Sequence, residues 1–161
     1  MQSISPENIF RGDGAWEEAL PLITKSIKRP LLLGRSEKTY HLRNKIYNDL
    51  KKEKIIISSA NLKFDCCYED ISRIKDIALE NNCDSIIAAG GGKVIDAGKY
   101  LAESLSIPSI TVPLSASTCA GWTALSNIYT KNGQFIKDVT LRSCPKILIF
   151  DHSFIKTAPI R

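Results

Sequence analysis

The feature that most restricts the fold of this chain is an alternation of short apolar runs with segments of helical periodicity. The runs are rich in β-branched residues or leucine and occupy 30–34, 54–58, 84–89, 108–112 and 146–150. Runs of this kind are typical of strands buried on both faces. Segments with a single apolar stripe follow the first three runs, at 37–52, 70–80 and 93–104. Strands and helices in this alternation predict βαβ units and an α/β fold with a parallel sheet.

The two ends of the chain are less regular. Residues 15–27 have helical spacing, but Pro21 lies inside them and predicts a kink or a later helix start. Residues 126–130 and 134–138 flank Lys131-Asn132-Gly133, which predicts a hairpin whose Asn-Gly pair has positive φ values. We expect no further helix after the last apolar run.

Composition indicates one globular domain covering 1–161. The chain is 43% hydrophobic and 24% charged, and its formal net charge of +5 is spread among acidic residues. A scattered charge favours a solvated surface over a nucleic-acid footprint. Five cysteines without a C-x-x-C pair indicate reduced thiols rather than a zinc site or disulfides. With no signal peptide and no apolar run of membrane length, we expect a cytoplasmic protein.

The strongest local signal for chemistry is the segment 89–99, AGGGKVIDAGK, which follows a predicted strand and opens a predicted helix. Three glycines let the backbone approach a diphosphate, and a helix N-terminus offers free N–H groups to it. The segment is not a Walker A motif, since Val94 stands where a hydroxyl residue is needed, and it is not G-x-G-x-x-G. The alternative is a glycine-rich turn that only joins strand to helix, but Lys93 and Asp96 add functional groups.

A second segment, 113–129, contains a series of small hydroxyl residues and follows another predicted strand. Open parallel sheets place their ligands at the carboxyl ends of strands. Taken alone, this segment is equally well explained as a serine-rich surface loop.

The two segments together resemble the glycerol dehydrogenase branch of the iron-containing alcohol dehydrogenase superfamily, from about Asn8 to Arg161. The resemblance rests on G-G-G-K-x-x-D-x-x-K, then P-x-x-A-S-T, A-L-S-x-I-Y and N-G-Q-F. It implies an open, Rossmann-like N-terminal domain that binds NAD or NADP. In the family, a helical C-terminal domain supplies an Asp and two His ligands to a divalent metal, which polarises the substrate. Dehydroquinate synthase and glycerol-1-phosphate dehydrogenase are similar relatives that share the glycine turn.

The resemblance also implies roles for particular residues. The pyrophosphate would lie on Gly90, Gly91, Gly92, Lys93 and Val94, with Asp96 beside the cofactor. The adenosine and phosphate side would be faced by Leu114, Ser115, Ala116 and Ser117. The nicotinamide half would be faced by Thr123, Leu125 and Tyr129.

Two departures from the family pattern bear on activity. Cys119 replaces a glycerol-contacting Asp, which argues against glycerol itself, and the nearby Trp122 either packs or lines a substrate entrance. The family's metal ligands lie beyond Arg161, and His41 and His152 are interpreted as surface histidines. We therefore expect no metal site and a truncated chain that is inactive alone.

The sequence thus predicts the N-terminal cofactor-binding portion of a metal-dependent alcohol or polyol dehydrogenase. The alternatives are a dehydroquinate-synthase-like lyase domain that uses NAD and a non-catalytic nucleotide-binding or interaction module. The expected partners are a small-molecule substrate and the dinucleotide, together with a missing C-terminal domain or a second copy, but neither nucleic acid nor membrane.

Arg35 bears on the choice of cofactor, since it aligns with an acidic position that favours NAD in the family. A guanidinium there, with Ser36 and no carboxylate nearby, favours the 2′-phosphate of NADP. The alternative is that Arg35 points to solvent. The adjacent Cys66 and Cys67 are either two ordinary buried thiols or a redox pair.

Overall fold

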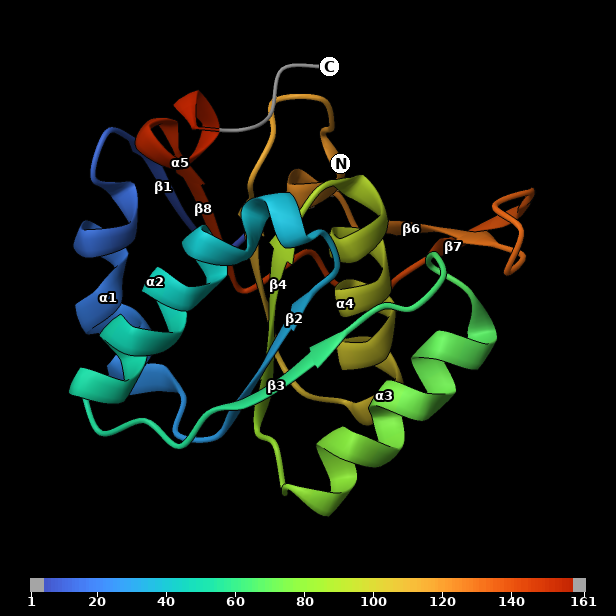
Figure 1. The fold of residues 1–161 in the computed structure, drawn as a ribbon, viewed down its shortest axis with the longest axis horizontal. Coiled ribbons are helices and arrows are strands. Elements are labelled where there is room, and N and C mark those ends of the chain that lie inside the picture. The colour runs from blue at the N-terminus through green and yellow to red at the C-terminus, as the bar shows by residue number, and fades with distance from the viewer. Residues whose placement is uncertain (1–4, 158–161) are drawn as a thin grey trace.

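The structure is a computed structural model that describes residues 5–157, and its centre is a six-stranded parallel sheet (Figure 1). In spatial order the strands are β1 (Asn8–Gly12), β8 (Ile147–Asp151), β5 (Ser109–Pro113), β4 (Ser85–Gly90), β2 (Pro30–Gly34) and β3 (Ser58–Asn61). The helices are α1 (Ala15–Ser26), α2 (Tyr40–Lys52), α3 (Tyr68–Glu80), α4 (Gly92–Leu105) and α5 (His152–Lys156). The α/β fold with a parallel sheet, predicted from the alternation of runs, is confirmed.

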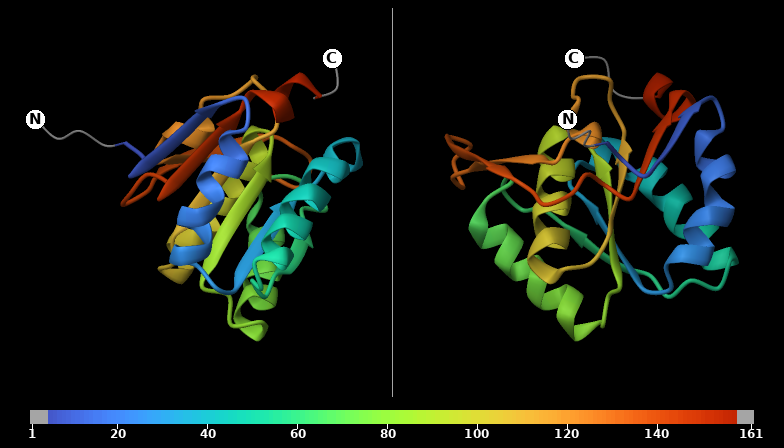
Figure 2. Two further views of the ribbon diagram at one scale, coloured as in Figure 1. Left: turned by 90° about the vertical axis from the view of Figure 1, so that its left-hand side faces the viewer. Right: turned by 180° about the vertical axis from the view of Figure 1, so that it is seen from behind.

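Helices cover both faces of the sheet, and the pleat of the central strands sends alternate residues to each side (Figure 2). Leu32 belongs to the apolar cluster under α1 and α2. Its neighbours Leu31 and Leu33 belong to the opposite cluster, which α3 and α4 cover. Because these strands are buried on both sides, continuous apolar runs rather than alternating ones mark them in the sequence.

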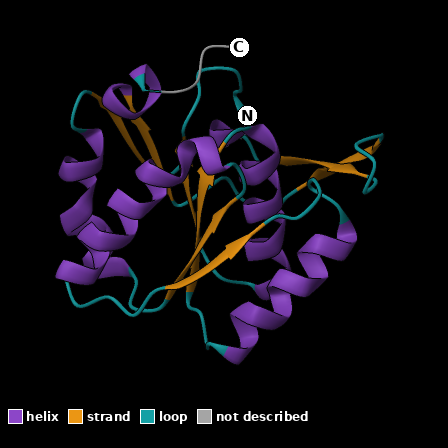
Figure 3. Cartoon of the chain, in the orientation of Figure 1, coloured by secondary structure: helices purple, strands orange, loops and turns teal. Residues whose placement is uncertain are grey.

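The predicted strand at 54–58 is wrong, because β3 begins only at Ser58. The amide of Ile55 donates to the carbonyl of Leu50 at 3.1 Å and closes the end of α2. Ile55 is buried in the cluster beneath that helix, whereas Ile56 is 59% exposed. These isoleucines therefore lie in the loop that leads into β3, drawn in teal in Figure 3. Helix α2 also begins later than predicted, at Tyr40, after a 3₁₀ turn at Glu37–Thr39.

The edge strand β1 had no clear sequence signal, because its residues alternate between half-buried and exposed. It pairs in parallel with β8, near the other end of the chain. The expectation of no further helix after β8 is also wrong. Asp151, at the end of β8, caps α5 by accepting a hydrogen bond from the Ser153 amide at 2.8 Å. Pro21 lies on the exposed side of α1 and does not delay that helix, which begins at Ala15.

The predicted hairpin is confirmed as β6 (Leu125–Tyr129) and β7 (Phe135–Thr140), an antiparallel pair outside the main sheet. It projects beside α4 in Figure 1. Only Gly133 of the Asn-Gly pair has positive φ, at 80°, so the expectation of positive φ at Asn132 is wrong. Among residues 5–157, no helix is long and apolar enough to cross a membrane.

Candidate functional site

The glycine-rich segment forms the turn between β4 and α4. β4 ends at Gly90, and α4 begins at Gly92 without a side-chain cap from the described residues. The amides of Val94 and Ile95 both donate to the Gly91 carbonyl, at 3.0 and 3.1 Å. The first amides of α4 are therefore left for a ligand, and the helix dipole adds partial positive charge there.

Close packing explains two of the three glycines. A Cβ at Gly90 would lie 2.8 Å from the Cβ of Val94, and one at Gly92 would lie 3.0 Å from the Oγ1 of Thr118. A Cβ at Gly91 would meet its nearest atom only at 3.8 Å. The backbone at Gly91 is thus open to approach by a ligand, which is what a phosphate-binding turn requires.

The turn opens into a cavity of about 920 Å³, within the size range of small-molecule sites. α2 and α4 leave the neighbouring strands β2 and β4 toward opposite faces of the sheet, and this divergence opens a crevice at the carboxyl ends of those strands. Twelve of the residues singled out from the sequence line the cavity: Arg35, Ser36, Gly90, Gly91, Gly92, Lys93, Val94, Asp96, Leu114, Ser115, Ser117 and Tyr129.

The other sequence-predicted residues lie outside this cavity lining. Ala116 and Cys119 are exposed on the loop after β5. The indole of Trp122 packs against the Phe150 ring, with 5.0 Å between ring centroids, so Trp122 is a packing residue in this structure. Thr123 and Leu125 contribute oxygens to a cluster around Lys99.

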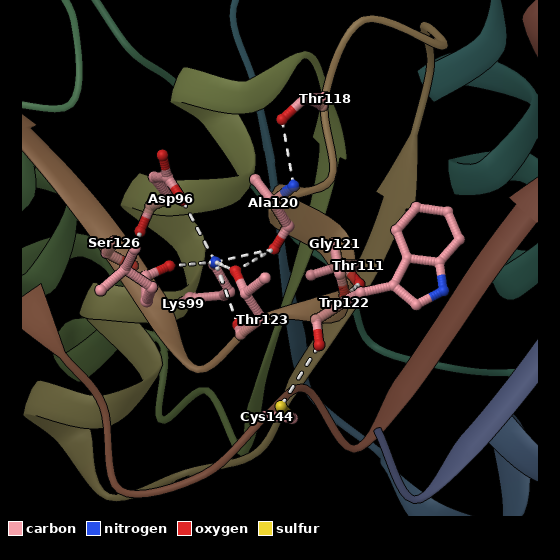
Figure 4. Close-up of polar contacts among 11 residues, drawn as sticks. Asp96, Lys99, Thr111, Thr118, Ala120, Gly121, Trp122, Thr123, Ser126 and Cys144 are labelled. Carbon is pink, nitrogen blue, oxygen red and sulfur yellow. Dashed lines mark hydrogen bonds and ion pairs between the residues drawn. The ribbon is translucent and has the colours of Figure 1, made fainter. Parts of the chain in front are cut away.

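Lys99 lies at the centre of that cluster, with only 1% of its side chain exposed (Figure 4). Its Nζ donates to the carbonyl oxygens of Ala120 at 2.7 Å, Thr123 at 3.2 Å and Leu125. It also lies 3.3 Å from the Thr123 hydroxyl and 3.1 Å from Asp96 Oδ1. The ammonium group thereby fastens the segment between β5 and β6 to α4.

Asp96 belongs both to this cluster and to the lining of the cavity. Burial raises the pKa of Asp96, and the nearby Lys99 opposes that rise. Burial lowers the pKa of Lys99, and Asp96 opposes that fall. The Ser126 hydroxyl donates to the backbone carbonyl of Asp96 at 3.0 Å, so the start of the hairpin is fixed to the same turn of α4. The sequence pattern did not indicate that these oxygen atoms surround the Lys99 ammonium group.

Asp65, which sequence reasoning missed, lies between two of the cavity's cations. Arg35 donates to Asp65 Oδ1, and Lys93 donates to Asp65 Oδ2 at 2.5 Å. The expectation that no carboxylate lies near Arg35 is therefore wrong. Asp65 follows β3 in a segment of no recognised pattern, and only the pairing of β3 with β2 brings it beside Arg35.

Within residues 5–157, no three His, Cys, Asp or Glu side chains are grouped to hold a metal ion. His41 is exposed, and His152 packs edge-on against Phe150 at 5.7 Å between ring centroids. Cys66 and Cys67 are both buried, and burial raises the pKa of the Cys66 thiol. A buried thiol with a raised pKa is inert, which supports the interpretation of Cys66 as an ordinary core residue, and Cys67 is buried beside it.

A parallel sheet, a glycine turn at its carboxyl edge and a large cavity over that turn together define an open α/β domain with a candidate ligand site at its topological switch point. The chain belongs to the iron-containing alcohol dehydrogenase family, whose model, "Iron-containing alcohol dehydrogenase", matches residues 6–152.

Named relatives agree with this assignment. The chain is 33% identical to a glycerol dehydrogenase of Escherichia coli O6:H1 over 116 residues, which cover 72% of this chain and 32% of the relative. The crystal structure of glycerol dehydrogenase from Schizosaccharomyces pombe matches with a TM-score of 0.85 and 26% identity, over 98% of this chain and 40% of that one.

A third match shares the fold at lower identity. The structure of sulfoacetaldehyde reductase from Bifidobacterium kashiwanohense in complex with NAD+ has a TM-score of 0.81 and 17% identity, and the match covers 98% of this chain and 48% of that one. This chain spans about a quarter to a third of the length of the first curated relatives it matches.

Proposed function

We propose that this chain, as one domain over residues 1–161, supplies the NAD(P)-binding part of an alcohol or polyol dehydrogenase. The observation that carries the proposal is the open turn at Gly91, where uncapped amides of α4 face the 920 Å³ cavity. Family membership supports the reaction class, and the NAD+ complex of the sulfoacetaldehyde reductase supports the kind of cofactor.

In this proposal, different residues at and near the cavity bind different parts of the dinucleotide. The diphosphate lies on the amides of Gly91 and Gly92, with the Lys93 ammonium compensating its charge. Leu114, Ser115, Ala116 and Ser117 face the adenosine and phosphate side, and Tyr129 faces the nicotinamide half. Thr123 and Leu125 act at that end through the loop that Lys99 holds.

When bound, the nicotinamide supplies a hydride acceptor or donor for a small alcohol or carbonyl substrate. In this proposal, Tyr129 positions that ring from the wall of the cavity. Among residues 5–157, no group of His, Cys, Asp or Glu side chains forms a ligand set for a metal. The relatives reported above are dehydrogenases and a reductase, which supports hydride transfer over a lyase reaction. The exposed Cys119 offers no carboxylate to a polyol, which argues against glycerol as substrate.

The proposal is tested by Gly91→Val. The fold tolerates a Cβ at Gly91, so the added isopropyl group occupies the space where the diphosphate lies. We expect calorimetric titration with NAD+ and NADP+ to show binding to the original chain and at least a tenfold loss in the variant. Ser72→Val, on the exposed side of α3, adds the same group away from the cavity and should leave both affinities unchanged. Equal affinity of Gly91→Val and the original chain would refute the assignment.

For the choice of cofactor, we further propose that Arg35 lets the site accept NADP. Its guanidinium borders the cavity, and 41% of its side chain is exposed. A guanidinium binds a phosphate through two parallel hydrogen bonds, which favours the 2′-phosphate. The ion pair between Arg35 and Asp65 weakens this preference.

A further inference from the structure

We propose that Asp65 sets the balance between NADP and NAD by offsetting one of the two positive charges that Arg35 and Lys93 bring to the edge of the cavity. This inference rests on the proposed dinucleotide binding and names a specificity-determining residue for it. Asp65 lies between β3 and α3, far in the sequence from both of its partners.

The two oxygens of the Asp65 carboxylate accept hydrogen bonds from two different cations of the site. Oδ1 accepts from Arg35, which follows β2, and Oδ2 accepts from Lys93, on the first turn of α4. The Asp65 side chain is 8% exposed, against 41% for Arg35 and 39% for Lys93. Asp65 is therefore more buried than the two cations, and both of them, unlike Asp65, line the cavity.

Neighbouring segments hold the carboxylate in this place. A Cβ at Gly133, in the turn of the hairpin, would lie 3.1 Å from Asp65 Oδ2, so that turn closes against the carboxylate. The Lys93 ammonium also lies over the Tyr129 ring, 4.7 Å from its centroid. Arg35, Lys93 and the hairpin turn at Gly133 thus converge on Asp65, and the carboxylate has little room to turn away when a ligand enters.

The consequence for specificity follows from charge. Arg35 and Lys93 carry two positive charges, and the negative charge of Asp65 offsets one of them. Asp65 is in direct contact with both cations, and salt screens charges in contact only weakly. NADP carries a 2′-phosphate that NAD lacks, so reducing the local positive charge weakens NADP binding more than NAD binding. Arg43, a buried cation that also lines the cavity, is held by neutral acceptors, the Thr39 hydroxyl at 2.7 Å and the Ser36 carbonyl at 2.8 Å.

The test is a double-mutant cycle on the 161-residue chain. Dissociation constants for NAD+ and NADP+ are measured by calorimetry at fixed ionic strength for the original chain, Asp65→Asn, Arg35→Gln and the double variant. We expect Asp65→Asn to raise the ratio of NADP+ to NAD+ affinity roughly fivefold, the order of a partly exposed charge pair. In the Arg35→Gln background, the same substitution should change the ratio by less than about twofold.

The control is Asp76→Asn, which removes the same charge from the exposed side of α3 and should leave the ratio unchanged. A ratio indifferent to Asp65→Asn, or shifted toward NAD+, overturns the role of Asp65. Should Asp65→Asn fail to fold, Arg35→Gln alone decides, because an unchanged ratio in that variant overturns the same role. If the original chain binds neither dinucleotide, the proposed function fails, and this inference fails with it.

Discussion

Replacing Lys99 by Met tests whether the buried ammonium holds the site together. The substitution keeps the length of the side chain but removes the donor that three carbonyl oxygens, one hydroxyl and the Asp96 carboxylate share. Breaking a buried ion pair by removing one partner costs about 3 to 5 kcal/mol. Asp96 takes up a proton more easily than an exposed carboxyl does, because burial raises its pKa, so we expect a loss near the lower end, about 3 kcal/mol in the free energy of unfolding.

The expected loss also depends on pH. Without Lys99, the pKa of Asp96 rises further above its value in the unfolded chain. A carboxyl group whose pKa is raised by folding destabilises the protein when it is ionised, and this penalty disappears as the pH falls through the raised pKa. The difference in stability between Lys99→Met and the original chain should therefore be largest at neutral pH and shrink in mild acid.

Urea unfolding followed by circular dichroism, at several pH values, measures both effects. Lys25→Met, on the exposed side of α1, is the matched control and should change stability by no more than about 0.5 kcal/mol. The double variant Lys99→Met/Asp96→Asn should lose the pH dependence. A loss below about 1 kcal/mol for Lys99→Met, or a loss that does not change with pH, would refute the reasoning.

Two further predictions concern packing and activity. Gly98→Ala should destabilise the chain by about 1 to 3 kcal/mol, because the new Cβ would lie 2.4 Å from the Cβ of Ala88. Thermal unfolding measures this loss. Ser104→Ala, on the exposed side of α4, is the control and should have little effect in the same assay. We expect the 161-residue chain to show no metal-dependent oxidation of alcohols, because its described residues contain no metal-ligand cluster. Turnover of glycerol or another alcohol that a chelator stops would contradict this expectation.

The prediction of the fold succeeded where the physical signal is local. The runs around 30–34, 84–89, 108–112 and 146–150 are strands within one residue of the expected ends, because burial on both faces demands continuous apolar residues. The run at 54–58 failed for a related reason. An apolar run reports burial but not pairing, and Ile55 is buried by capping the end of α2 rather than by joining the sheet.

For the site, too, local features could be predicted from the sequence and long-range contacts could not. The sequence by itself determined the turn at Gly90–Lys93 and its position at the start of a helix, since glycine content, helix periodicity and the preceding strand are properties of neighbouring residues. Only the tertiary structure decided what surrounds that turn. Asp65 meets Arg35 and Lys93, and Lys99 meets the carbonyls of the loop after β5, through contacts that span 21 to 30 positions in the chain. Such contacts depend on the order of strands in the sheet, which no local pattern of residues encodes.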